Sequence, residues 1–217
     1  MNERVGHVGG IATRLLFEND DVKVWEMDVA AGARFPHHHH SLEYLFYVTA
    51  PAVLTVSRHG VEPYNVDARE RALYTYPGDK SETFLNNGPG PYREVLVELK
   101  RPPSPDQRAL SFTKCEALVG QKPAPGTTRI LENDRVVISE TMLEPQEEAI
   151  VANPRDAVTY VLEGARLSVT EPTDGKRARM VEEDRPPHGV YWETAGGSRK
   201  LKNLGDGHYR QLTVELK

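Results

Sequence analysis

The chain has 217 residues, and its 27 lysines and arginines against 32 acidic residues give a formal net charge of −5. This length suits either one large domain or two domains of about 100 residues each, a size that can bury its own core. The basic residues are scattered and form no stripe, so we expect no nucleic-acid partner.

Cysteine content and hydropathy indicate the compartment. A single cysteine, Cys115, excludes an internal disulfide. The first residues lack the apolar core of a signal peptide, and no apolar run approaches the roughly 18 residues of a membrane span. We therefore expect a cytoplasmic protein with no membrane partner.

Short apolar or alternating runs predict strands along nearly the whole chain. Gly, Pro and Asn/Asp residues typical of turns separate these runs. This pattern predicts an all-β protein. The clearest runs are residues 22–27, 53–57, 93–98, 136–138, 158–161 and 167–169.

Four consecutive histidines, residues 37–40, follow the first of these strands. Because alternate residues of a strand share one face, His38 and His40 are candidates to converge on one divalent metal ion, with Glu43 as a nearby carboxylate. His37 and His39 would then lie on the opposite face. The run is internal and lies between apolar segments, which argues against an affinity tag.

A proline-rich connector is predicted over residues 102–126, between a first domain at 1–101 and a second at 127–217. Proline clusters bound it at both ends. Within it, residues 106–112 have the one helical period of the chain, which predicts a short helix there.

The two predicted domains repeat each other. Residues 86–100 resemble residues 203–217, offset by 117 (203 − 86), and residues 16–22 resemble residues 130–136, offset by 114 (130 − 16). A period this long indicates duplicated domains, since solenoid repeats span roughly 20–50 residues. Short, evenly spaced strands in two halves suit a pair of antiparallel barrels or jelly rolls.

These features resemble the cupin superfamily, and in particular its two-barrel form, the bicupin. The family's first motif is Gly, five residues, His-X-His, a spacer of three or four residues and an acid. Its counterparts here, with a spacer of only two residues, are Gly32, His38, His40 and Glu43. Shifting the histidine pair back by one residue restores the spacer but shortens the gap after the glycine, so both registers stay open.

The family's second motif, Pro-Gly followed by a histidine and then an asparagine, resembles residues 76–86. Aligning back from Asn86 places Glu82 at the histidine position. In the family, three histidines and one acid hold iron, manganese, nickel, zinc or copper. The resemblance implies one divalent transition metal (Fe, Mn, Ni or Zn) with His38, His40, Glu43 and Glu82 as ligands, or a site that the missing histidine weakens.

Carrying both motifs across the repeat predicts a second domain without a metal. The alignment places Val151 and Asn153 at the two histidine positions, Asp156 at the acid and Arg199 at the Glu82 position. The histidines are missing, and an arginine repels a divalent cation at close range. We expect the second domain to serve structure, dimerisation or pocket closure.

Two imidazoles and carboxylate oxygen around Fe(II) approach the arrangement that leaves positions open for oxygen activation. The resemblance thus implies a metal-dependent dioxygenase acting on a small carboxylate or diketone-like substrate. The alternative is a non-catalytic small-molecule-binding or structural bicupin with an incomplete metal site. A homodimer is left open. The tyrosines expected to line the barrel and the arginine expected to hold a substrate anion are Tyr44, Tyr47, Tyr74, Tyr76 and Arg93.

Overall fold

The computed structural model describes residues 10–173 and 176–217. Residues 1–9, where the sequence shows no signal-peptide pattern, lie outside the described part. The regular structure of the described residues is all β-strand, which confirms the predicted all-β class. None of these residues belongs to a helix long and apolar enough to cross a membrane. The chain divides into two compact units, Met1–Gln121 and Lys122–Lys217.

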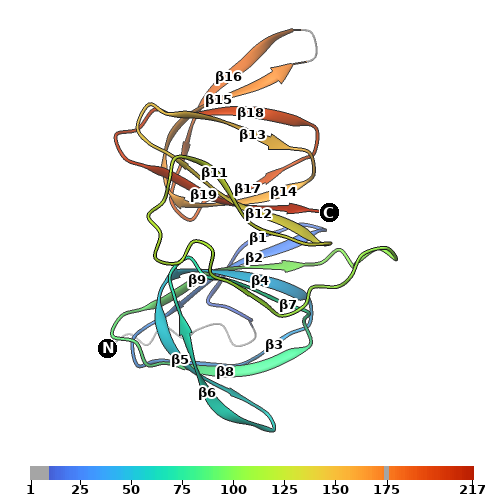
Figure 1. The fold of residues 1–217 in the computed structure, drawn as a ribbon, viewed down its shortest axis with the longest axis vertical. Coiled ribbons are helices and arrows are strands. Elements are labelled where there is room, and N and C mark those ends of the chain that lie inside the picture. The colour runs from blue at the N-terminus through green and yellow to red at the C-terminus, as the bar shows by residue number, and fades with distance from the viewer. Residues whose placement is uncertain (1–9, 174–175) are drawn as a thin grey trace. The chain divides into compact units, whose positions relative to one another are not determined.

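The first unit contains two antiparallel sheets that face each other across a hydrophobic interior, an arrangement typical of a jelly roll (Figure 1). The larger sheet has the strand order β1-β2-β9-β4-β7-β10, and the smaller has β3-β8-β5-β6. The strands are β1 (Arg14–Glu18), β2 (Val22–Val29), β3 (Arg34–His40), β4 (Glu43–Ala50), β5 (Ala52–Arg58), β6 (Val61–Ala68), β7 (Leu73–Tyr76), β8 (Lys80–Asn86), β9 (Tyr92–Leu99) and β10 (Thr113–Cys115).

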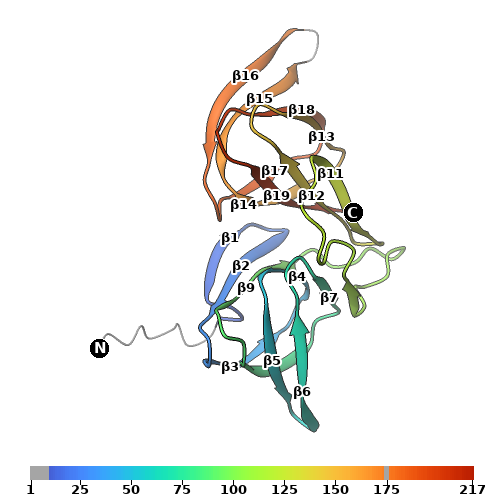
Figure 2. The same ribbon diagram turned by 60° about the vertical axis from the view of Figure 1, so that its left-hand side comes forward.

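The second unit repeats this topology without a counterpart of β10 (Figure 2). Its sheets have the orders β11-β12-β19-β14-β17 and β13-β18-β15-β16. The strands are β11 (Gly126–Glu132), β12 (Val136–Leu143), β13 (Glu148–Asn153), β14 (Ala157–Glu163), β15 (Ala165–Thr173), β16 (Lys176–Arg185), β17 (Val190–Glu193), β18 (Gly197–Asn203) and β19 (Tyr209–Leu216).

Alternating apolar residues from both sheets of the first unit meet in one core. Met27 on β2, Leu54 and Val56 on β5, and Phe84 on β8 belong to this cluster. Leu143, Val161, Leu167 and Leu201 are among the residues that form the corresponding core of the second unit. Burying one such side chain contributes about 1.5–3 kcal/mol, so these faces determine which side of each strand points inward.

Matching asparagine turns begin the second strand of each unit. Asn19 Oδ1 accepts hydrogen bonds from the backbone N–H groups of Asp21 and Val22, each at 2.9 Å. Asn133 Oδ1 accepts the equivalent bonds from residues 135 and 136, at 2.9 and 3.0 Å. The repeat detected in the sequence at this offset is therefore a repeat of local structure.

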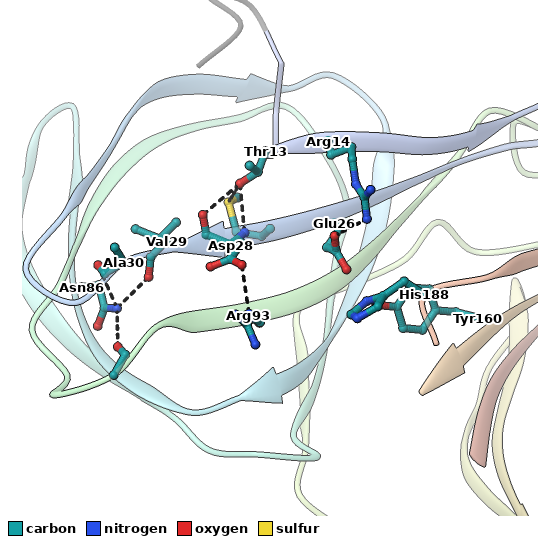
Figure 3. A network of polar contacts seen from close by, with 12 residues as sticks. Thr13, Arg14, Glu26, Asp28, Val29, Ala30, Asn86, Arg93, Tyr160 and His188 are labelled. Atoms are coloured by element: carbon teal, nitrogen blue, oxygen red, sulfur yellow. Dashed lines mark hydrogen bonds and ion pairs between the residues drawn. The ribbon is translucent and has the colours of Figure 1, made fainter. Parts of the chain in front are cut away.

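A second matching asparagine in each unit donates hydrogen bonds to backbone carbonyl groups in the interior. Asn86 Nδ2 donates to the carbonyl oxygens of Val29, at 2.9 Å, and of Ala30, at 3.2 Å (Figure 3). Asn203 Nδ2 donates to the carbonyl oxygen of Leu143 at 3.1 Å. Both asparagines are fully buried, so these bonds satisfy carbonyl groups that water does not reach.

Residues 102–121, assigned to a connector from the sequence, belong to the first unit. Within this segment, β10 pairs with β7 and extends the larger sheet. The helix expected over residues 106–112 is wrong, because the chain makes only a turn there, closed by Gln107 N–H donating to Ser104 O at 2.9 Å. A helix this short is only marginally stable by itself. In addition, the backbone N–H of Leu110 donates to the Glu43 carboxylate at 2.5 Å instead of to a carbonyl group of a helix.

Candidate metal centre

Strands β3 and β8 bring three candidate ligands together. In their antiparallel register His38 lies opposite Glu82. His38 and His40 point inward and are 7% and 2% exposed, whereas His37 and His39 are exposed. Of the two registers that the sequence leaves open, the structure has His38 and His40 inside.

A β-bulge in β3 determines this choice. Phe35 lies opposite Phe84, but His38 lies opposite Glu82, so β3 contains one extra residue between the two pairs. Phe35 packs against the core of the first unit. Without the bulge, plain alternation from Phe35 would turn residues 37 and 39 inward and leave His38 and His40 outside.

The geometry of the three residues suits a single ion. One nitrogen of His38, one nitrogen of His40 and one carboxylate oxygen of Glu82 all lie within 4.8 Å of one another. Metal bonds to such ligands are about 2.1 Å long, so small side-chain adjustments would bring the three atoms onto one ion.

Both imidazoles are in the protonation state that metal binding requires. Burial lowers the pKa of His38, and it lowers the pKa of His40 to about 3, so both rings are neutral at pH 7. His38 Nδ1 lies 3.0 Å from the carbonyl oxygen of Pro36 and donates to it, which leaves Nε2 as the lone-pair nitrogen. His40 Nδ1 has no hydrogen-bond partner among the described residues. Neutral imidazole nitrogens of this kind are suitable ligands for a divalent transition metal.

Two cations share the Glu82 carboxylate. Lys80 Nζ lies 2.9 Å and Arg58 Nε 3.0 Å from the same oxygen, Oε2. Burial lowers the pKa of Lys80, an effect that the Glu82 charge opposes. These cations compete with a metal ion for the carboxylate.

The candidate ligands border a cavity of about 710 Å³ in the first unit. Tyr44 stacks on His40, with ring centroids 4.0 Å apart, and Tyr76 stacks on Tyr44 at 5.0 Å. The Lys80 ammonium lies 3.7 Å from the centroid of the Tyr76 ring. The cavity therefore combines an aromatic wall with a half-buried cation. Its aromatic lining residues are Tyr44, Phe46, Tyr64, Tyr74, Tyr76, Phe84, Tyr92 and Phe112.

Glu94, on β9, is a cavity residue that the sequence analysis missed. Its side chain lines the cavity and accepts a short hydrogen bond from Tyr92 Oη. Burial raises the pKa of Glu94 to about 8. The repeat contained a signal, because Tyr92-X-Glu94 in the first half corresponds to Tyr209-X-Gln211 in the second.

Three residues predicted for the site lie elsewhere. Glu43, at the start of β4, is outside the group of converging ligands, and its carboxylate accepts the bond from Leu110. Tyr47 is buried, but alternation places it on the face of β4 opposite Tyr44, away from the cavity lining. Arg93 is exposed and pairs with Asp28 at 3.0 Å (Figure 3). Of the residues expected to line the barrel or to hold a substrate anion, Tyr44, Tyr74 and Tyr76 line the cavity.

The second unit places different side chains at the equivalent positions. Val151 lies opposite Arg199 in the β13–β18 register, as His38 lies opposite Glu82 in the first unit, which agrees with the sequence alignment. Arg199 Nη1 pairs with Glu193 at 3.1 Å. Asp156 accepts a hydrogen bond from the backbone N–H of residue 195 at 2.8 Å, a structural role similar to that of Glu43.

Comparisons with known proteins show the fold. No family model matches the sequence, and no curated protein matches it. AerE from Microcystis aeruginosa is structurally similar, with a TM-score of 0.65 at 11% identity over 93% of this chain and 90% of that chain.

Oxalate decarboxylases are similar as well. One structure, from a study of proton-coupled electron transfer, has a TM-score of 0.64 at 13% identity. Another, of the Bacillus subtilis enzyme and its Mn(II) centres, has a TM-score of 0.61 at 12% identity. Each match covers 90% of this chain and 69% of the other. Together these similarities confirm the predicted fold of cupin-type jelly rolls.

Proposed function

We propose that the first unit binds one divalent transition metal through His38, His40 and Glu82, and that the protein is an oxygenase acting on a small carboxylate or diketone-like compound. The observation that supports this proposal is the convergence of two neutral imidazoles and one carboxylate within 4.8 Å beside a cavity. Two histidines and one carboxylate leave coordination positions open for substrate and O₂. When bound, the metal supplies Lewis acidity and one-electron redox chemistry.

Iron and manganese are the metals that this ligand set favours. A carboxylate is a harder ligand than the imidazole it replaces, so Glu82 shifts preference towards oxygen-preferring ions. The Mn(II) centres of the structurally similar Bacillus subtilis oxalate decarboxylase support manganese as one candidate.

The cavity lining favours an organic anion with an apolar body. Tyr44 and Tyr76 offer flat apolar faces, and Lys80 supplies the positive charge beside them. A carboxylate or enolate group of the substrate would bind beside the Lys80 ammonium. The low solvent exposure of Lys80 strengthens the attraction between the two charges. Phe112, with its ring centroid 5.0 Å from that of Tyr76, adds an apolar side chain to the lining.

A non-catalytic binding protein is the second candidate, and the contacts of Glu82 favour it. Lys80 and Arg58 already neutralise this carboxylate, so the site is electrostatically satisfied without a metal. In that case the protein would bind an organic anion in the same cavity, and the imidazoles of His38 and His40 would serve as neutral hydrogen-bonding groups.

Metal analysis of the untagged protein, followed by oxygen-uptake screening against small carboxylates and diketones, separates the two candidates. One equivalent of iron or manganese with oxygen consumption supports the oxygenase. Protein that stays metal-free in the presence of these ions, yet binds an organic anion, supports the binding protein. Glu82→His provides a check on the ligand set, because restoring a third imidazole should raise the affinity for zinc and nickel. An unchanged metal preference would remove Glu82 from the proposed ligands.

A further inference from the structure

We infer that Glu94 is the proton-exchanging group of the first cavity, and that the compound bound there carries an acidic C–H bond next to a carbonyl group. This inference rests on the proposed function, since it assigns a residue and a substrate class to the same cavity. It concerns a side chain that does not belong to the proposed metal ligands.

The position of Glu94 suits this role. Its side chain lines the cavity, although the residue as a whole is only 5% exposed. On the strands to either side its register partners are Met27 and Val48, so neither flanking residue carries a charge. Tyr92 Oη donates to Oε2, and Oε1 has no hydrogen-bond partner among the described residues. One oxygen is thus held in place while the other is available to a ligand.

The second unit shows that the hydrogen bond from the tyrosine does not require an acid. At the equivalent position Tyr209 Oη donates to the amide oxygen of Gln211 at 2.6 Å. An amide accepts this bond as a carboxyl group does, and it avoids the cost of burying an ionisable group. The structural role alone therefore does not account for the carboxyl group of Glu94.

The electrostatic surroundings keep Glu94 able to exchange a proton near neutral pH. Burial raises its pKa to about 8, while the Tyr92 hydroxyl lowers it, the Glu82 charge raises it and the Lys80 charge lowers it. The Tyr44 hydroxyl of β4 is the other titratable group that interacts with it, and that hydroxyl stays protonated because burial raises its pKa. A carboxyl group with a pKa near the working pH is suited to both donating and accepting a proton.

The proposed step transfers one proton and no other atom. The C–H bond of the bound compound breaks, its electron pair moves to the adjacent carbonyl to form an enolate, and the proton bonds to Oε1 of ionised Glu94. Lys80 and Arg58 offset the negative charge that develops in the cavity. The reverse transfer returns a proton to carbon and regenerates the carboxylate.

Hydrogen exchange in D₂O tests this step directly. The protein is incubated with a panel of enolisable probes, 2-oxobutyrate, 2-oxoglutarate and 2,4-hexanedione, and deuterium incorporation is followed by NMR. We expect the wild-type protein to accelerate exchange of at least one probe and Glu94→Gln to lower the rate about 100-fold. Glu98→Gln is the matched control, because Glu98 is a buried glutamate of the same strand that lies outside the cavity lining.

An infrared measurement gives a readout independent of turnover. We expect the C=O band of a buried, protonated carboxyl group at pH 7 in the wild type and in Glu98→Gln, and its loss in Glu94→Gln. Metal content should be unchanged in Glu94→Gln. If the wild-type protein holds no metal but its hydrogen exchange still depends on Glu94, only the proposed metal function is refuted. Equal exchange rates in Glu94→Gln and wild type, no accelerated exchange of any probe, or an unchanged carboxyl band would each overturn the inference.

Discussion

The two units contain the same ion pair with the charges reversed. In the first unit Arg58 on β5 pairs with Glu82 on β8 at 3.0 Å. At the equivalent positions of the second unit Glu171 on β15 pairs with Arg199 on β18 at 3.5 Å. The fold thus accepts either direction of the pair, but only the first places a carboxylate opposite an inward-facing histidine.

Three further charged side chains of the second unit lie close to one another. Arg185, with a side chain that is 4% exposed, donates to Glu183 at 2.6 Å and lies over the Tyr191 ring at 4.5 Å. Glu193 lies between Arg185 and Arg199, at 3.6 and 3.1 Å. We interpret the second unit as a scaffold whose interior charges are paired, and its lack of a metal stays a prediction.

Imposing the residue of the second unit on the first should cause the largest loss of stability of any single substitution. Glu82→Arg gathers three cations, residues 58, 80 and 82, and we expect it to lower the free energy of unfolding by about 3 kcal/mol. Adding Arg58→Glu recreates the reversed pair and should recover most of that loss, while both variants lose metal binding. Urea denaturation measures the difference, and a double variant no more stable than Glu82→Arg would show that the two pairs are not equivalent.

Removing the inward asparagine should have a smaller effect, similar in both units. Asn86→Ala leaves the carbonyl oxygens of Val29 and Gly90 without their donor, and Asn203→Ala does the same at Leu143 and at residue 207. We expect each change to cost about 2 kcal/mol, measured by native-state hydrogen exchange in the affected unit. If only one of the two substitutions lowers stability, the two asparagines do not have the same structural role.

Glu94 should make the stability of the first unit depend on pH, whereas Gln211 does not titrate. The folded protein holds a proton on Glu94 up to pH about 8, while the unfolded chain releases it near 4.5. Stability from this group therefore falls as pH rises from 4.5 to 8, by about 1.4 kcal/mol per pH unit. Denaturation of chelator-treated protein should show a shallower fall in Glu94→Gln, and identical pH profiles would contradict the buried, protonated carboxyl.

The smallest effect is expected at Glu43, which the spacing of the first motif had indicated as a ligand. Glu43→Gln keeps an oxygen that accepts the Leu110 N–H, so neither metal content nor stability should change measurably. Metal analysis beside wild-type protein checks this expectation. Loss of metal in Glu43→Gln would return this residue to the ligand set.

The fold and the repeat were predictable because their signals are local. Alternation marks strands, and Asn19 and Asn133 begin matching turns within a few residues. The position of the histidines relative to the interior was not predictable, since the bulge between Phe35 and His38 depends on how β3 pairs with β8. For the same reason, the number of residues between His40 and Glu43 did not show whether the Glu43 carboxylate reaches the metal site.

Residue faces were the other point that sequence could not resolve. Alternation shows that Tyr44 and Tyr47 lie on opposite faces of one strand, and Arg93 and Glu94 on opposite faces of another. Only the packing of the two sheets decides that Tyr44 and Glu94 face the cavity. Choosing Tyr47 and Arg93 was therefore wrong in face rather than in strand.

The most direct test of the account is the metal stoichiometry of the untagged protein and of His38→Ala/His40→Ala, loaded with manganese or iron and measured by elemental analysis. We expect one ion per chain in the wild type, none in the double variant and one in His39→Ala, whose imidazole is outside the cavity. Full metal content in the double variant, or a second ion retained by the second unit, would contradict it.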